Sequence, residues 1–204
     1  MIKAFLFDYG GVMTAGGKSG ELGERLGKIL GIPPEQAYLL LANAWDDFAV
    51  GEISEEKLWQ GIEASSGIRV LPEQRKIWDT WQHTNVLPEM RQLVRELKAK
   101  GYSVGLVANV IPNTLDEINR HGGYDDFEFL ILSCEVGYAK PDPEIYKLAF
   151  DYLPGIDPSE MMFIDDQERF LVPAKQLGMQ ILLATNPSQV IADVRELTLA
   201  NHIS

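Results

Sequence analysis

The chain has 204 residues, with 18 Lys and Arg against 30 Asp and Glu, so its formal net charge is −12. This length suits one globular domain, or one domain with a modest insertion. Because the acidic excess repels phosphate backbones and anionic headgroups, nucleic acid and membrane are poor partners. The longest apolar stretches, residues 38–42 and 181–184, fall far short of the roughly 20 residues of a transmembrane helix, and no signal peptide is recognisable. A single cysteine, Cys134, makes a reducing, cytoplasmic compartment the default expectation.

Short apolar runs alternate with helical patterns over most of the chain. The first run covers residues 2–7 and stops at Asp8-Tyr9-Gly10-Gly11, which is typical of a buried strand followed by a turn. Further runs lie at residues 102–107, 127–132, 161–164 and 180–184, and helical patterns lie at residues 88–100, 114–121, 143–152, 168–177 and 189–199. This alternation predicts a Rossmann-like α/β core, in which a parallel sheet is covered by helices on both faces.

Residues 19–83 break the alternation. Apolar residues at helical spacing recur there in four places, at residues 22–30, 39–44, 58–62 and 77–81. Since the segment contains no convincing strand pattern, we expect a small α-helical bundle inserted after the first strand. The predicted organisation is a core formed by residues 1–18 and 84–204, with a helical domain at residues 19–83.

Four separated motifs follow the predicted strands. They are Phe7-Asp8-Tyr9-Gly10-Gly11-Val12, Val107-Ala108-Asn109, Lys140-Pro141-Asp142-Pro143 and Phe163-Ile164-Asp165-Asp166. Because right-handed crossovers place the loops after parallel strands at one edge of the sheet, their polar residues should converge. The order and placement of these motifs resemble those of the haloacid dehalogenase superfamily, and the resemblance covers essentially the whole chain.

The resemblance implies a phosphatase with a helical cap. The inserted segment matches the position of the C1-type cap that one large branch of the superfamily carries between its first and second motifs. Within it, the sequence from Gly51 to Trp59 resembles the cap helices of the sugar-phosphatase-like branch. The implied substrate is therefore a small phosphorylated metabolite, for example a sugar phosphate.

The chemistry of phosphoryl transfer gives each motif residue a role. Asp8 would be the nucleophile that attacks phosphorus in line and forms an aspartyl phosphate. Asp8, Asp165 and Asp166 form a hard oxygen cluster suited to Mg²⁺, to which Gly10 would add its backbone carbonyl, as in the family pattern. Lys140 would hold Asp8 and the phosphoryl oxygens together by its positive charge. The expected contacts to the substrate phosphate come from Gly11, Ala108 and Asn109.

Two positions depart from the family pattern. Most phosphatases of the superfamily have an aspartate two residues after the nucleophile, where it serves as general acid and base, but this chain has Gly10. General acid–base help is typically worth about 10²–10⁴ in rate. The family also has Ser or Thr where this chain has Ala108, and a lost hydrogen bond to a charged group is worth roughly 1.5–3 kcal/mol.

The sequence thus predicts a magnesium-dependent hydrolase of a small phosphate ester, of undetermined oligomeric state. Two alternatives remain. A 2-haloacid dehalogenase would use Asp8 to displace halide from carbon without a metal, although the Asp165-Asp166 pair argues against a metal-free site. A catalytically silent binding protein with the same fold is favoured by Gly10 and Ala108.

Overall fold

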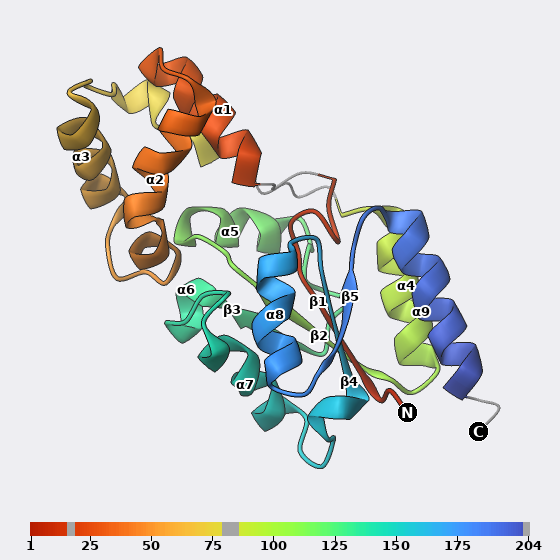
Figure 1. Cartoon of the computed structure of the whole chain (residues 1–204). Helices are drawn as coiled ribbons and strands as arrows, with labels where there is room; N and C mark the ends of the chain where they lie inside the picture. The colour runs from red at the N-terminus through yellow and green to blue at the C-terminus, as the bar shows by residue number, and fades with distance from the viewer. Residues whose placement is uncertain (16–18, 79–85, 202–204) are drawn as a thin grey trace.

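The computed structural model describes residues 1–15, 19–78 and 86–201. At its centre lies a five-stranded sheet with the strand order β3-β2-β1-β4-β5 (Figure 1). The strands are β1 (Ala4–Phe7), β2 (Ser103–Ala108), β3 (Phe129–Leu132), β4 (Met161–Asp165) and β5 (Gln180–Leu183). Every neighbouring pair is parallel, which confirms the predicted α/β class.

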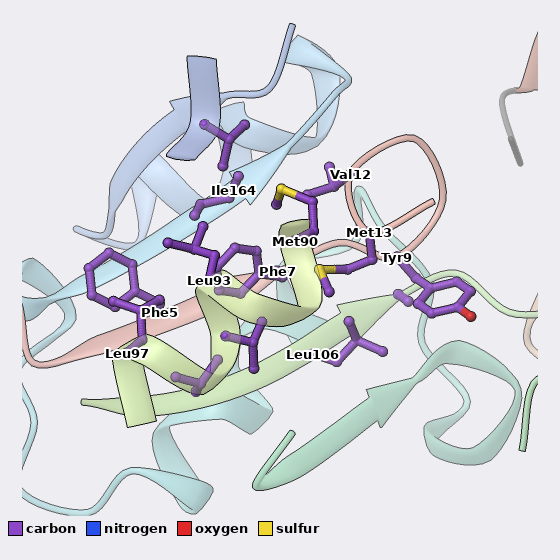
Figure 2. Close-up of a cluster of buried hydrophobic side chains, with 14 of the residues drawn as sticks. Phe5, Phe7, Tyr9, Val12, Met13, Met90, Leu93, Leu97, Leu106 and Ile164 are labelled. Atoms are coloured by element: carbon purple, nitrogen blue, oxygen red, sulfur yellow. The ribbon is translucent and has the colours of Figure 1, made fainter. Parts of the chain in front are cut away.

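Helices cover both faces of the sheet (Figure 1). They are α4 (Pro88–Ala99) and α9 (Pro187–Asn201) on one face, and α7 (Pro143–Tyr152) and α8 (Glu168–Gln176) on the other, while α5 (Pro112–Arg120) follows β2 and α6 (Ser133–Val136) follows β3. Figure 2 shows the cluster in which Phe7 of β1 packs with Leu93 of α4. Leu6 belongs to the opposite cluster, with Tyr146 and Leu171 of α7 and α8. Because successive strand residues point to opposite faces, β1 has to be apolar throughout.

Where it is described, the segment between β1 and α4 consists mainly of helices and contains no strand, as predicted. It contains α1 (Ser19–Leu30), α2 (Pro34–Ala49) and α3 (Glu55–Ser66), which contribute to one hydrophobic cluster that includes the fully buried Trp59. The chain leaves and re-enters the α/β part at adjacent points, because Thr14 forms a β-bridge with Val86. The predicted domain boundaries fall within residues 16–18 and 79–85, which lie outside the described residues, so the division into two domains stays a prediction.

The helix expected at residues 77–81 differs from the structure as far as it is described. Pro72–Gln74 and Lys76–Trp78 are two separate 3₁₀ turns, and residues 79–81 lie outside the described part. Arg75, between the turns, is held by side chains of α3, since its guanidinium donates to Glu56 at 2.6 Å and to Glu63 at 3.1 Å. The contacts of Arg75 with α3 thus hold this stretch in place, although it does not form one continuous helix. None of the helices that the structure describes combines the length and apolarity needed to cross a bilayer.

Candidate active site

Strand pairing brings the first and fourth motifs together. β1 lies between β2 and β4, and the backbone N–H of Asp8 donates to the Ile164 carbonyl at 2.9 Å, which extends the β1–β4 ladder by one residue. Asp165 is the last residue of β4. The loop after Asp8 is anchored by buried side chains, among them Tyr9 and Met13, which lie in the cluster of Figure 2. Asp8 is therefore held beside Asp165 on a rigid turn.

Lys140 bridges these two carboxylates. Its Nζ donates to Asp8 Oδ1 at 2.6 Å and to Asp165 Oδ2 at 2.7 Å, and its side chain is completely buried. Burial by itself lowers the pKa of Lys140, but the two ion pairs outweigh it and hold the pKa above its usual value. The contact with Asp8 agrees with the expectation from the third motif, whereas the contact with Asp165 is not part of that expectation.

Burial raises the pKa of Asp8 from 3.8 to about 7. Lys140 opposes this shift, whereas the negative charges of Asp165 and Asp166 add to it. Among the described residues, the cation in hydrogen-bond contact with Asp8 is Lys140. The raised pKa indicates that this single positive charge does not compensate for burial and for the neighbouring carboxylates, and a further cation close to Asp8 would lower the pKa again.

The two adjacent aspartates at the end of β4 have different surroundings. Asp165 is fully buried, and both of its oxygens are engaged, Oδ2 by Lys140 and Oδ1 by the backbone N–H of Gln167 at 2.8 Å. Asp166 is only half-buried. Carboxylate oxygens of Asp8, Asp165 and Asp166 lie within 4.8 Å of one another, so the three residues are close enough to share one metal ion.

Gly11 makes room for Asp166. Its φ of +83° is a left-handed conformation that side chains disfavour, and a Cβ atom at this position would lie 2.8 Å from Asp166 Cγ. Gly11 therefore permits a close approach between the turn after β1 and the turn after β4. A contact of Gly11 with the substrate phosphate stays a prediction.

Ala108 is the last residue of β2, and Asn109 directly follows it. The Asn109 amide pairs with the backbone of Lys140: Oδ1 accepts from the Lys140 N–H at 2.7 Å, and Nδ2 donates to the Lys140 carbonyl at 2.9 Å. Ala108 is 1% exposed and belongs to the same hydrophobic cluster as Phe7. Their expected contacts with substrate stay predictions, as does the carbonyl role of Gly10, which lies in the turn after Asp8.

The four sequence motifs do not indicate two features of the site. The clamp of Asn109 on Lys140 joins the second and third motifs, and nothing in either motif alone indicates it. Ser133, a fully buried polar residue, directly follows β3 at the same edge of the sheet. Its position after a predicted strand is the signal that would have singled it out.

The ends of the parallel strands thus bring together an aspartate, a buried lysine and two further carboxylates, an arrangement that can support nucleophilic attack by a carboxylate and the binding of a cation. The comparisons with known proteins name the family. Residues 2–178 match the model of the haloacid dehalogenase-like hydrolases, and the chain belongs to this family.

Relatives of the chain include a sesquiterpene phosphatase of Aspergillus oryzae, 27% identical over 201 residues, with 96% of each chain covered. Bifunctional epoxide hydrolase 2 of Sus scrofa is 36% identical over 145 residues, 65% of this chain, and the chain spans 25% of that relative's length. Among solved structures, a HAD family enzyme of Bacteroides thetaiotaomicron in complex with magnesium and inorganic phosphate matches with a TM-score of 0.72 and 26% identity, covering 91% of this chain and 95% of that one.

Proposed function

We propose that the protein is a magnesium-dependent phosphatase that hydrolyses phosphate monoesters of small metabolites through an aspartyl phosphate on Asp8. The observation that carries this proposal is the convergence of Asp8, Asp165 and Asp166 beside a buried Lys140. The similarity to a phosphatase and to a structure with bound magnesium and phosphate supports the same chemistry.

The donor set fits magnesium. Mg²⁺ prefers hard oxygen ligands at about 2.0–2.1 Å, and it is commonly held by one or two carboxylates with waters completing its shell. Asp8, Asp166 and the backbone carbonyl of Gly10 would hold the ion, while Asp165, whose oxygens are already engaged, orients Lys140. When bound, the ion neutralises charge between the nucleophile and the phosphoryl group.

The reaction proceeds in two displacements. A carboxylate oxygen of Asp8 attacks phosphorus, and the bond to the ester oxygen breaks, with its electron pair leaving on that oxygen. Lys140, 2.6 Å from Asp8 Oδ1, would offset the mutual repulsion between the Asp8 carboxylate and the negatively charged phosphoryl oxygens. Water then attacks the aspartyl phosphate, which releases inorganic phosphate and regenerates Asp8.

Gly10 limits the choice of substrate in this mechanism. Since no side chain at this position can protonate the leaving oxygen, the proton comes from water or from a hydroxyl of the substrate. Esters with good leaving groups are therefore favoured, and a sugar 1-phosphate, whose anomeric oxygen leaves more readily than a primary alkoxide, is one such ester. The helical segment of residues 19–83 would act as the cap that selects the substrate.

The test is release of inorganic phosphate from a panel of phosphate esters, with magnesium and with a chelator. We expect turnover that requires magnesium and disappears in Asp8→Asn, whereas Asp151→Asn, which alters an exposed aspartate of α7, should retain it. Metal-independent halide release from 2-chloropropionate would instead support the dehalogenase. Tight binding of phosphate esters without any turnover would support the silent binding protein.

A further inference from the structure

Ser133 joins the α/β part of the molecule to the helical segment. It is fully buried, and its Oγ accepts a hydrogen bond from the Val110 N–H at 2.9 Å and donates to the Ala49 carbonyl at 2.8 Å. Ala49 is the last residue of α2, where carbonyls lack partners within the helix. The hydroxyl of Ser133 thus caps α2 from a different part of the chain.

The surroundings of Ser133 form a packed junction. Ile111, in the loop after β2, is fully buried in the hydrophobic cluster of the helical segment. Gly51, just after α2, lies close to α6, since a Cβ atom on it would be 3.7 Å from the Cys134 carbonyl. The helical segment is therefore fixed to the α/β part at the point where Ser133 makes its bonds.

A series of hydrogen bonds and one peptide bond connects Ser133 to the nucleophile, Asp8. Val110, which donates to Ser133, directly follows Asn109. The Asn109 amide holds the backbone of Lys140 through two hydrogen bonds, and Lys140 Nζ donates to Asp8. A shift of α2 relative to the sheet would therefore displace the loop that holds Lys140.

We infer that Ser133 is a positioning residue that couples the docking of α2 to the placement of Lys140. Ser133 does not touch the reacting atoms, because its hydroxyl is committed to Val110 and Ala49. The kinetic part of this inference rests on the proposed phosphatase function. The structural part, the coupling of Ser133 to Lys140, can be measured without any substrate.

The first test is amide hydrogen exchange in Ser133→Ala. Since the Val110 N–H donates to Ser133 and the Lys140 N–H donates to Asn109, both amides should exchange about tenfold faster, the scale of coupling along packed networks. The matched control is Thr198→Val, which removes another buried hydroxyl, one bonded to the Arg195 carbonyl on α9. It should lower stability without changing exchange at Val110 or Lys140.

The second test is kinetic. With a small, activated phosphate ester, Ser133→Ala should lower kcat about tenfold and leave KM nearly unchanged, because a misplaced lysine weakens the transition state more than ground-state binding. Thr198→Val should keep the wild-type kcat. If the wild type hydrolyses no ester, the proposed function fails. Hydrogen exchange of the Lys140 amide still shows whether Ser133 is coupled to Lys140.

A double-mutant comparison separates coupling from simple loss of stability. Asn109→Ala removes the clamp on Lys140, so adding Ser133→Ala to it should change Lys140 exchange no further. Additive effects would overturn the inference, as would unchanged exchange at Lys140 in a folded Ser133→Ala protein. If Ser133→Ala does not fold, Ser133→Cys is the substitute, because it keeps a weak donor of similar size. It should show the same changes in exchange to a smaller degree. Wild-type exchange of the Lys140 amide in Ser133→Cys would equally refute the coupling.

Discussion

The raised pKa of Asp8 predicts that magnesium binding depends on pH. Burial and the neighbouring carboxylates raise this pKa to about 7, and a carboxylate has to lose its proton before it can bind a cation. Well below pH 7, each pH unit should therefore lower the apparent magnesium affinity about tenfold. Between pH 7, where Asp8 is half ionised, and pH 5 the loss is about 50-fold, or about 2.3 kcal/mol, and well above pH 7 the affinity should level off.

Isothermal titration of metal-free protein with magnesium, at constant ionic strength from pH 5 to pH 8.5, measures this dependence. Asp8→Asn should bind more weakly, and its affinity should lack the tenfold step per pH unit. Asp151→Asn should retain the wild-type slope, since this side chain is exposed on α7 and is not one of the three clustered carboxylates. A wild-type affinity that stays constant between pH 5 and pH 7 would refute the reasoning, because Asp8 would then be ionised throughout or would not bind the ion.

The raised pKa of Asp8 also determines whether the stability of the metal-free protein rises or falls with pH. An unfolded chain ionises Asp8 near pH 3.8, whereas the folded protein keeps this proton until about pH 7. The stabilising contribution is therefore complete below pH 3.8 and is lost as the pH rises through about 7. Relative to Asp8→Asn, the metal-free wild type should become less stable across this window, and saturating magnesium should restore its stability above pH 7.

Three further predictions concern single residues of the site. Asp8→Asn should abolish phosphate release while circular dichroism shows an intact fold; undiminished release would move the chemistry elsewhere. Gly11→Ala should weaken magnesium binding at least tenfold, because the new Cβ displaces Asp166. Gly137 has a similar φ of +75° but open space where a Cβ would lie, so Gly137→Ala should only lower the stability, by about 1 kcal/mol. Asp166→Asn should weaken magnesium binding more than Asp165→Asn does, and equal losses in titration would contradict their assigned roles.

Much of the fold follows from local sequence signals. The apolar runs that became β1 and β4 are continuous because helices cover both faces of the sheet, and this continuity distinguishes them from half-exposed strands. Once the strands are parallel, the loops after them share one edge, so the proximity of Asp8 and Asp165 follows from topology. The structure brings both together with Lys140, as the motifs predict.

The contacts that distinguish Asp165 from Asp166 do not follow from local sequence. Asp165 and Asp166 are chemically identical neighbours that differ only in their surroundings. Lys140 and the backbone of Gln167 engage the carboxylate of Asp165, whereas Asp166 is half-buried. The direction of the Asn109 amide is likewise a property of tertiary geometry, because its partner lies 31 residues away in the chain. Local pattern cannot specify hydrogen bonds between distant segments.

The last prediction concerns the missing general acid. If the absence of a carboxyl at position 10 limits the reaction, Gly10→Asp should raise turnover of an alkyl phosphate by up to about 10²–10⁴, the usual worth of general acid–base catalysis. The gain should shrink with a nitrophenyl phosphate, whose leaving oxygen needs little protonation. Ala108→Ser should help both esters about equally, because a hydroxyl there would contact the phosphoryl group rather than the leaving oxygen.

The matched control for Gly10→Asp is Gly10→Asn, which adds a side chain of nearly the same size but with no acidic proton. Magnesium affinity and thermal unfolding of both variants show whether either substitution disturbs the turn between Asp8 and Gly11. A gain confined to the aspartate and to the alkyl ester would identify proton transfer as the missing step. Equal gains on both esters, or equal gains from both variants, would show that the absent acid does not limit this site, and turnover would then be governed by the metal and Lys140.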